Sequence, residues 1–252
     1  MDSTYKESDL VRCGRCRDES GLDFDFTMAF QPIVNLRNKE IFGYEALVRG
    51  LNNESAYSII SQVNEHNRYA FDQQCRIKAI SLASQLKLQS ILSINFLPKA
   101  IYQPDRCIRT TLEAAKKYKF PIENILFEFT EVEKIEDAEH VRRVVEYYNS
   151  LGFKTAVDDF GAGYSGLGQL ANFQTDFIKI DMGLIRSVQK DKVRQIILKN
   201  CIHMMNELNI SILAEGVETE GELNWLAEAG IVLMQGYLFA KPGFEELPSV
   251  IF

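Results

Sequence analysis

The stretch "FKTAVDDFGAGYSGLGQLANFQTDFIKID" (residues 153–181) holds two apolar runs of strand length, separated by glycine-rich and polar residues. Apolar runs that alternate with helical segments predict parallel strands joined by crossover helices. The first run ends in two adjacent carboxylates, Asp158 and Asp159. Like charges side by side repel each other unless a cation or solvent relieves the repulsion. The stretch therefore predicts a strand–helix–strand unit that presents charge at the end of a strand.

The rest of the chain repeats this alternation. Strands are predicted over residues 28–36, 40–49, 90–95, 124–131, 153–160, 175–181, 210–218 and 231–242, with helices between them from the second strand onward. Eight strands within about 225 residues favour a closed (β/α)₈ barrel over an open doubly wound sheet. The short turn "RNK" between the first two strands predicts an antiparallel pair. The predicted fold class is thus α/β, a modified TIM-like (β/α)₈ barrel with one antiparallel strand near the N-terminus.

Two of the predicted helices have clear patterns. Thr219 and Glu222 have the spacing of a capping box, at the start of a helix that ends at Gly230. Another helix is expected to carry one long apolar face, made of Val193, Ile196, Ile197, Cys201, Met204 and Leu208.

Composition and charge exclude several classes of protein. A net charge of −7 argues against sequence-independent binding to duplex nucleic acid, which needs a basic surface. The chain has no uninterrupted run of about 18 apolar residues, so no transmembrane helix is predicted. The charged N-terminus does not resemble a secretory signal. Five cysteines, an odd number, fit a reducing compartment better than a disulfide framework. We therefore expect a cytoplasmic protein, either complete or cut from a larger one.

Residues 1–23 are polar and contain one C-x-x-C pair, Cys13 and Cys16. They are expected to form a leader ahead of a single domain over residues 24–252. A zinc site would need two further ligands. A metal or redox role and a tail with two exposed thiols therefore both remain open.

Polar side chains gather at the ends of the predicted strands. In a barrel, the C-terminal ends of the strands converge on one mouth, where active sites are built. Carboxylate and amide oxygens suit Mg²⁺ or Mn²⁺, and several of them could hold two ions about 4 Å apart for an in-line attack at phosphorus. A lysine among them could orient the attacking water or stabilise phosphoryl charge. The residues concerned are Glu45, Asn95, Glu128, Asp158, Asp159, Lys179, Glu215 and Gln235.

Each of these residues alone also has an ordinary interpretation. Glu45 could be a surface acid, and Asn95 could cap the loop that follows it. Lys179 could merely pair with a neighbouring acid. Two further acids, Glu131 and Glu218, each lie three residues past a candidate ligand and could be charges at helix N-termini. The joint pattern is what favours a functional site.

Several motifs resemble the EAL-domain family of cyclic-di-GMP phosphodiesterases. "EAL" (45–47) lies within "YEALVR", and the other motifs follow in the family's order over roughly residues 26–245. They are "FQPIV" (30–34), "SINFLP" (93–98), "FEFTE" (127–131), "DDFGAGYSGL" (158–167), "IKID" (178–181), "AEGVE" (214–218) and "QGYLFAKP" (235–242).

The resemblance implies a barrel with one antiparallel strand and the Mg²⁺- or Mn²⁺-assisted hydrolysis of cyclic di-GMP to linear pGpG, with two ions expected. The metal ligands that it implies are Glu45, Asn95, Glu128, Asp158, Asp159 and Glu215. Lys179 resembles the residue that positions the attacking water, and Gln235 resembles a residue that orders water. The resemblance thus implies four catalytic residues: Lys179, Gln235, Glu45 and Glu215. Gln31 and Arg49 look like substrate contacts. Glu131 resembles the glutamate that anchors the 158–167 loop. Glu218 resembles a residue that supports the metal ligands without binding the metal.

Three functional hypotheses remain open at this stage. The first is an active phosphodiesterase, which the intact set of motifs favours. The second is a catalytically weak effector that binds cyclic di-GMP, and the third is an interaction module that uses the barrel as a scaffold. The resemblance also implies a homodimer, and a sensory input from a partner or from a domain outside this sequence.

Overall fold

The computed structural model describes residues 22–97, 100, 101, 103–130, 138–162 and 166–252 of the chain. The strands in this part are β1 (Thr27–Asn35), β2 (Glu40–Arg49), β3 (Ile91–Asn95), β4 (Ile125–Thr130), β5 (Lys154–Phe160), β6 (Phe177–Ile180), β7 (Ser211–Ala214), β8 (Leu233–Met234) and β9 (Gly243–Phe244). The helices are α1 (Ala56–Ile60), α2 (Arg68–Gln85), α3 (Pro104–Cys107), α4 (Arg109–Tyr118), α5 (Ala138–Ser150), α6 (Gly166–Asn172), α7 (Met182–Ile185), α8 (Lys192–Glu207) and α9 (Glu220–Glu228).

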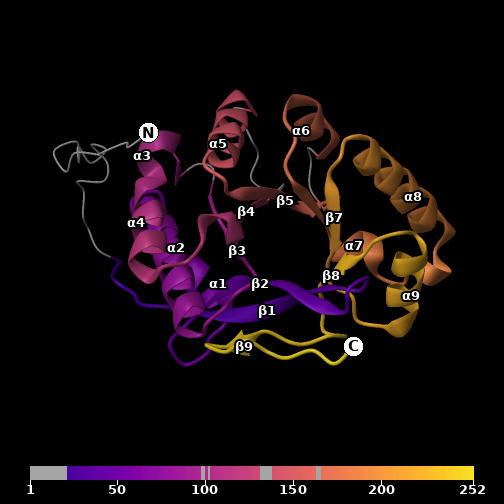
Figure 1. The fold of residues 1–252 in the computed structure, drawn as a ribbon, viewed down its shortest axis with the longest axis horizontal. Helices are drawn as coiled ribbons and strands as arrows, with labels where there is room; N and C mark the ends of the chain where they lie inside the picture. The colour runs from indigo at the N-terminus through magenta and orange to yellow at the C-terminus, as the bar shows by residue number, and fades with distance from the viewer. Residues whose placement is uncertain (1–21, 98–99, 102, 131–137, 163–165) are drawn as a thin grey trace.

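The strands close into a barrel, with most of the helices around its outside (Figure 1). Strands β2 to β8 are parallel neighbours in chain order, and β1 pairs antiparallel with both β2 and β8 to close the ring. The predicted barrel with one antiparallel strand near the N-terminus is confirmed. The short strand β9 pairs with β1 outside the ring, and it is absent from the predicted strands.

The last parallel strand is much shorter than the sequence predicts. We expected a strand over residues 231–242, but β8 covers only Leu233–Met234. Beyond it, the backbone bonds to Val217 in the loop after β7: Val217 N donates to Gln235 O and Leu238 N to Val217 O. A Cβ at Gly236 would lie 2.0 Å from the carbonyl oxygen of Val217, so only glycine permits this approach. The apolar run "VLMQGYLFA" is therefore mostly a packed turn.

A layer of apolar side chains fills the barrel interior. It has one fully or largely buried residue from each of seven strands: Ile33, Ile91, Leu126, Ala156, Phe177, Leu213 and Leu233. Successive strand residues point to opposite faces, so side chains two positions apart share the interior. Whatever stands two residues beyond this layer on a parallel strand therefore also faces the interior.

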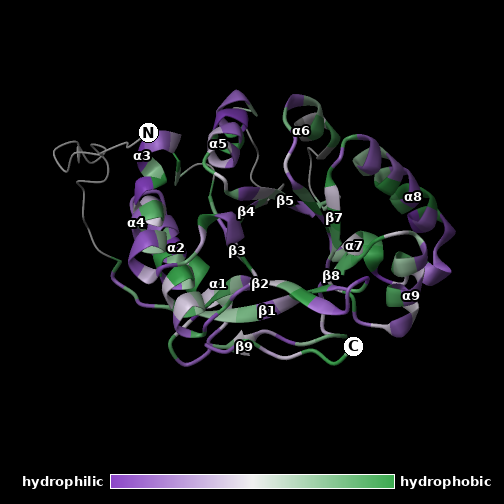
Figure 2. Cartoon of the chain, in the orientation of Figure 1, coloured by the Kyte–Doolittle hydropathy of each residue, from purple (hydrophilic) through white to green (hydrophobic). Residues whose placement is uncertain are grey.

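The outer helices carry hydrophilic and hydrophobic residues in alternation, as expected when one face is buried (Figure 2). The predicted capping box of α9 is present: Glu222 N donates to Thr219 Oγ1, and Thr219 N donates to Glu222 Oε2. None of the helices in the described residues is both long and apolar enough to cross a membrane.

The helix α8 buries a face that the sequence did not single out. Leu198, Ile202 and Met205 pack against the barrel. The predicted apolar face points mainly outward instead, and Val193, Ile196 and Ile197 are 65%, 52% and 41% exposed. We call the predicted face, made of Val193, Ile196, Ile197, Cys201, Met204 and Leu208, the α8 stripe; Cys201 and Met204 in it are partly buried and pack against the core. Both faces are apolar, so periodicity alone could not tell which of them packs inward.

Candidate active site

The polar residues at the strand ends lie one step above the apolar layer. Along the parallel strands, Leu126 is followed two residues later by Glu128, Ala156 by Asp158, Phe177 by Lys179, Leu213 by Glu215 and Leu233 by Gln235. On the antiparallel strand β1 the order is reversed, and Gln31 precedes Ile33. The period of two residues thus places all of these side chains at the C-terminal mouth of the barrel.

Lys179 lies at the centre of this cluster and is fully buried. Its Nζ is 2.6 Å from Glu215 Oε1, 2.7 Å from Glu128 Oε2 and 3.1 Å from Asp158 Oδ1. Glu45 Oε2 lies slightly farther away, at 3.4 Å. One ammonium group therefore contacts carboxylates on β2, β4 and β5 and one directly after β7.

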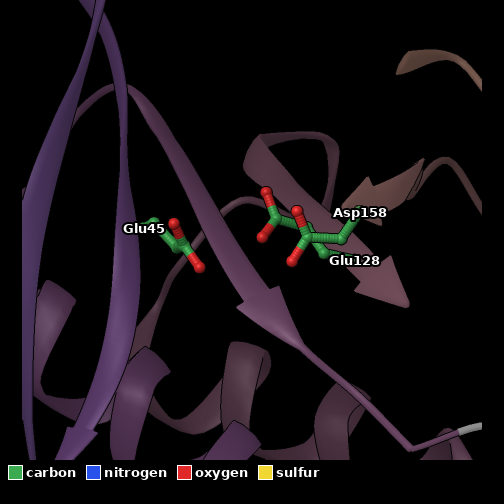
Figure 3. Close-up of side chains that lie close together, drawn as sticks. All are labelled: Glu45, Glu128 and Asp158. Atoms are coloured by element: carbon green, nitrogen blue, oxygen red, sulfur yellow. The ribbon is translucent and has the colours of Figure 1, made fainter. Parts of the chain in front are cut away.

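The carboxylates form two groups that could each hold a cation. In one group, ligand oxygens of Glu45, Glu128 and Asp158 lie within 4.8 Å of one another. Figure 3 shows the carboxylates of Glu128 and Asp158 side by side, pointing toward Glu45 on β2. In the other group, Asp158, Asp159 and Glu215 have the same spacing. Asp158 belongs to both groups, which is the position of a bridging ligand.

The adjacent aspartates reach the same mouth because the strand is irregular between them. Successive residues of a regular strand would point to opposite faces. The β5–β6 register shifts between Val157 and Phe160, and Asp159 has a φ of 54°, in the left-handed region. Asp159 N also donates to Asp158 Oδ1 at 3.0 Å. This local distortion turns both carboxylates toward one site.

The pKa directions follow from burial and charge. Burial raises the pKa values of Glu128 and Glu215 well above the usual range for glutamate, although the nearby Lys179 opposes the shift. Burial also acts against the charged form of Lys179, but the surrounding carboxylates outweigh it and raise the pKa of the ammonium. Burial, followed by repulsion from Asp158, raises the pKa of Asp159 to about 6. Among the described residues, the cluster thus has five carboxyl groups and one lysine, and without a cation the protonated forms of Glu128, Asp159 and Glu215 are favoured.

Amide side chains complete the cluster. Asn95 Nδ2 donates to Glu45 Oε1 at 2.8 Å, which leaves the Asn95 amide oxygen as a donor for a cation. Gln235 Nε2 donates to Glu45 Oε2 at 3.0 Å and to Gln31 Oε1 at 3.3 Å. The buried Gln235 Oε1 has no hydrogen-bond partner among the described residues. These oxygens, with the carboxylates, are the donor set that Mg²⁺ or Mn²⁺ prefers, so the site fits such ions.

A pocket of about 260 Å³ opens beside the cluster. It is lined by Gln31, Glu45, Asp159, Asp181, Met182, Glu215, Gly216, Glu218, Gln235, Gly236 and Tyr237. The lining combines acidic residues with Tyr237, whose side chain is exposed.

Two predicted site residues of the described part of the chain, Arg49 and Glu218, stand apart from the cluster. Arg49 Nη1 donates to Val48 O at 2.7 Å, and Arg49 does not line the pocket. Glu218 lines the pocket, but its carboxylate pairs with Arg186 at 2.7 Å. Glu131 lies outside the described residues, as do Cys13 and Cys16.

Ser93 is a residue of the site that sequence reasoning missed. Its hydroxyl is fully buried and donates to Glu128 Oε1. Ser93 stands two residues after Ile91 of the apolar layer, so the period of two residues that places Glu128 could also have pointed to Ser93. Serine carries no charge, and for that reason it did not attract attention in the sequence.

Comparisons with known proteins agree with this geometry. The model of the EAL domain matches residues 20–242. A standalone EAL protein from Vibrio cholerae O395, solved in its c-di-GMP-bound form, is 71% identical over 92% of this chain and 98% of that chain, with a TM-score of 0.90. The cyclic di-GMP phosphodiesterase PdeR from Escherichia coli is 38% identical over 59% of this chain and 22% of its own length.

A third relative was solved with a metal. The manganese and cy-diGMP complex of Klebsiella pneumoniae BlrP1 is 35% identical, with a TM-score of 0.82, and covers 87% of this chain and 56% of that chain. The chain spans about half the length, or less, of the curated relatives that it matches. The chain thus shares its barrel fold with proteins that were solved with c-di-GMP bound. The chain belongs to the EAL domain family.

Proposed function

We propose that this protein hydrolyses one phosphodiester bond of cyclic di-GMP to give linear pGpG, with Mg²⁺ or Mn²⁺ as cofactor. The observation that supports this most directly is the convergence of four carboxylates, on or directly after four different strands, around one buried lysine. The names of PdeR and of the c-di-GMP-bound Vibrio cholerae relative support the choice of substrate. In this reaction, water forms a bond to phosphorus, and the bond from phosphorus to a ribose oxygen breaks.

The proposed cofactor is a pair of divalent cations held by Glu45, Asn95, Glu128, Asp158, Asp159 and Glu215. Such ions supply positive charge that stabilises the attacking and leaving oxygens of an in-line displacement. The manganese complex of BlrP1 supports the choice of metal.

The protein's own groups then position the reactants. The ammonium group of Lys179 donates to carboxylates on both sides of the cluster, so it is placed to orient the attacking water and to stabilise charge on the phosphoryl oxygens. Gln235 is proposed to order the attacking water, since its side chain is held by contacts with Glu45 and Gln31. Glu45 and Glu215 are proposed to act with Gln235 on this water. Glu215 lines the pocket beside Lys179 Nζ, so its carboxylate is placed to accept the proton that the attacking water releases, while the leaving ribose oxygen takes up a proton from solvent.

The remaining contacts belong to substrate and loop. Gln31 lines the pocket and is proposed to contact the substrate. Arg49 is proposed to contact the substrate phosphate through the guanidinium N–H groups that do not donate to Val48 O. Glu131 is proposed to anchor the 158–167 loop, and Glu218 to support the pocket wall through Arg186.

The test is hydrolysis of cyclic di-GMP in Mg²⁺ or Mn²⁺, with products separated by chromatography. Glu45→Gln keeps the shape of the side chain but removes a ligand charge, and we expect turnover to fall by about 100-fold or more. Glu40→Gln, on the same strand but exposed and remote from the cluster, is the matched control and should keep full activity. Nucleotide binding without pGpG formation in either metal would overturn the proposal and favour the weak effector.

The assembly and cellular context are part of the proposal. We propose a homodimer of a domain over residues 24–252, preceded by the 1–23 leader, and the exposed α8 stripe supports self-association. The family match over residues 20–242 supports these boundaries. An input signal would come from a sensory partner or a further domain. Location in the cytoplasm stays a prediction, which cell fractionation tests.

A further inference from the structure

A buried ion pair lies outside the acidic cluster, on the opposite face of the barrel wall. Asp72 and Arg76 are one turn apart on α2, with Arg76 Nη2 2.7 Å from Asp72 Oδ2. Arg76 is 0% and Asp72 is 2% exposed. Burying two charges is costly unless their geometry does something that apolar side chains would not do. The reaction at the mouth does not use either charge directly.

Asp72 reaches the chain segment that leaves β3. Its Oδ1 accepts a hydrogen bond from the backbone N–H of Leu97 at 3.0 Å. The preceding N–H, of Phe96, donates to Glu128 O on β4 at 2.9 Å. Both backbone donors that follow Asn95 are thereby fixed, one by the neighbouring strand and the other by a side chain from α2.

Arg76 packs on the aromatic residues behind the same strand ends. Its guanidinium carbon lies 5.7 Å from the ring centre of Phe96 and 5.1 Å from that of Phe127. Its Nη1 donates to Tyr148 OH on α5 at 3.1 Å. Phe96 follows Asn95 and Phe127 precedes Glu128, so these rings back two of the proposed metal ligands.

We propose that Asp72 is a positioning residue, which uses its hydrogen bond to Leu97 N–H to hold the end of β3 so that the Asn95 amide stays at the cation site. Arg76 keeps Asp72 in place and closes the network against Phe96, Phe127 and Tyr148. This inference rests on the proposed function, because it concerns the cation that the function needs. Partners of metal ligands typically change metal affinity by about 10–100-fold when removed.

Two double variants separate the hydrogen bond from the charges. Asp72→Leu/Arg76→Met replaces the ion pair by apolar side chains and leaves Leu97 N–H without its acceptor. Asp72→Asn/Arg76→Met also removes both charges, but it keeps an acceptor oxygen for Leu97 N–H. Ser84→Ala is the control, because it removes a hydrogen bond between the same helix and Tyr118 O, far along α2 from the β3 end.

The readout is Mn²⁺ binding by titration calorimetry, with a melting curve to confirm folding. We expect the Asp72→Leu/Arg76→Met protein to bind Mn²⁺ about tenfold more weakly than wild type. The Asp72→Asn/Arg76→Met and Ser84→Ala proteins should stay within about twofold of it, since neither loses the acceptor for Leu97. Equal affinity of the two double variants would overturn the inference.

The design also covers the other outcomes. If Asp72→Leu/Arg76→Met does not fold, Asp72→Ala/Arg76→Met replaces it and must show the same weaker binding. A wild-type protein that binds Mn²⁺ but releases no pGpG would refute the proposed function, and the comparison of the double variants would still decide the role of Asp72. A wild-type protein that binds no Mn²⁺ would refute both.

Discussion

Lys179 is the residue on which the metal-free site depends. It is the one cation that contacts Glu45, Glu128, Asp158 and Glu215 in the described part of the chain. Burial without a partner would be very unfavourable for any of these charges. The lysine therefore acts as the internal counter-ion of the carboxylates whenever no metal is bound.

This role predicts the stability of Lys179 variants. Lys179→Met should lower the free energy of unfolding in EDTA by about 3–5 kcal/mol, since it leaves buried carboxylates unpaired. Urea unfolding followed by circular dichroism measures the change. Adding Glu128→Gln to Lys179→Met should restore part of the loss, because one negative charge goes with the positive one. A double variant no more stable than Lys179→Met would contradict the counter-ion role.

The raised pKa of Asp159 predicts that the free energy of unfolding depends on pH in an unusual way. Its pKa is raised to about 6 in the folded protein, against about 3.9 in an unfolded chain. Between these values the folded state binds more protons than the unfolded state, so this residue makes stability fall as pH rises. Below the lower value it has no effect, and above pH 6 its destabilising effect is complete.

The difference in the free energy of unfolding between wild type and Asp159→Asn isolates the contribution of this carboxyl group. In EDTA, Asp159→Asn should gain stability relative to wild type as pH rises from about 4 to about 6, and the gain should level off above that. Thermal melts in a pH series measure it, and saturating Mn²⁺ should remove the gain because the cation favours the ionised carboxylate. A difference that does not change with pH would contradict the raised pKa.

At the scale of single elements, the short helix α9 depends on its N-terminal cap. Thr219 Oγ1 accepts a hydrogen bond from Glu222 N, and Glu222 in turn accepts from the backbone of Thr219, Glu218 and Ser187. The cap thus ties the start of α9 to the wall of the pocket at Glu218 and to the loop before α8.

Removal of this cap should cost stability but leave chemistry intact. Thr219→Ala should lower the free energy of unfolding by about 1 kcal/mol, measured by urea denaturation. Ser55→Ala, at the N-cap of the exposed five-residue helix α1, is the matched control and should cost less. If both variants lost the same free energy of unfolding, the capping box of α9 would stabilise the protein no more than the N-cap of α1.

At the scale of the whole molecule, the α8 stripe is the feature that a barrel domain alone does not explain. Val193, Ile196 and Ile197 are exposed on α8, one of the helices on the outside of the barrel (Figure 1). Exposed apolar patches of this kind often mark a contact with another protein.

If the α8 stripe mediates self-association, a charge within it should separate the protomers. We expect Val193→Asp/Ile197→Asp to be monomeric at concentrations where wild type is dimeric, by light scattering after size exclusion. Asn206→Asp adds a charge to α8 outside the stripe and should remain dimeric. A dimeric double variant would place the contact elsewhere on the molecule.

Local sequence patterns are enough to predict the barrel and the clustering of most of the polar residues at the strand ends. Alternating strands and helices are written in local apolar patterns, and the period of two residues sets which strand positions face the interior. Polar residues such as Glu128 and Lys179 could therefore be placed at one mouth before any contact was known. The short turn before Glu40 likewise determined the antiparallel first strand, because so few residues cannot form a crossover.

Details that depend on contacts between distant segments could not be predicted from local patterns. Asp159 turns to the same side as Asp158 because β5 loses its regular register against β6, which the sequence of β5 does not show. The β8 strand stops early because its backbone bonds to the loop at Val217. The inward face of α8 was chosen by the barrel surface it meets, since both faces are apolar. Asp72 and Ser93 acquire their partners only when α2, β3 and β4 pack together, because a local pattern cannot specify which distant backbone group or carboxylate a side chain will meet.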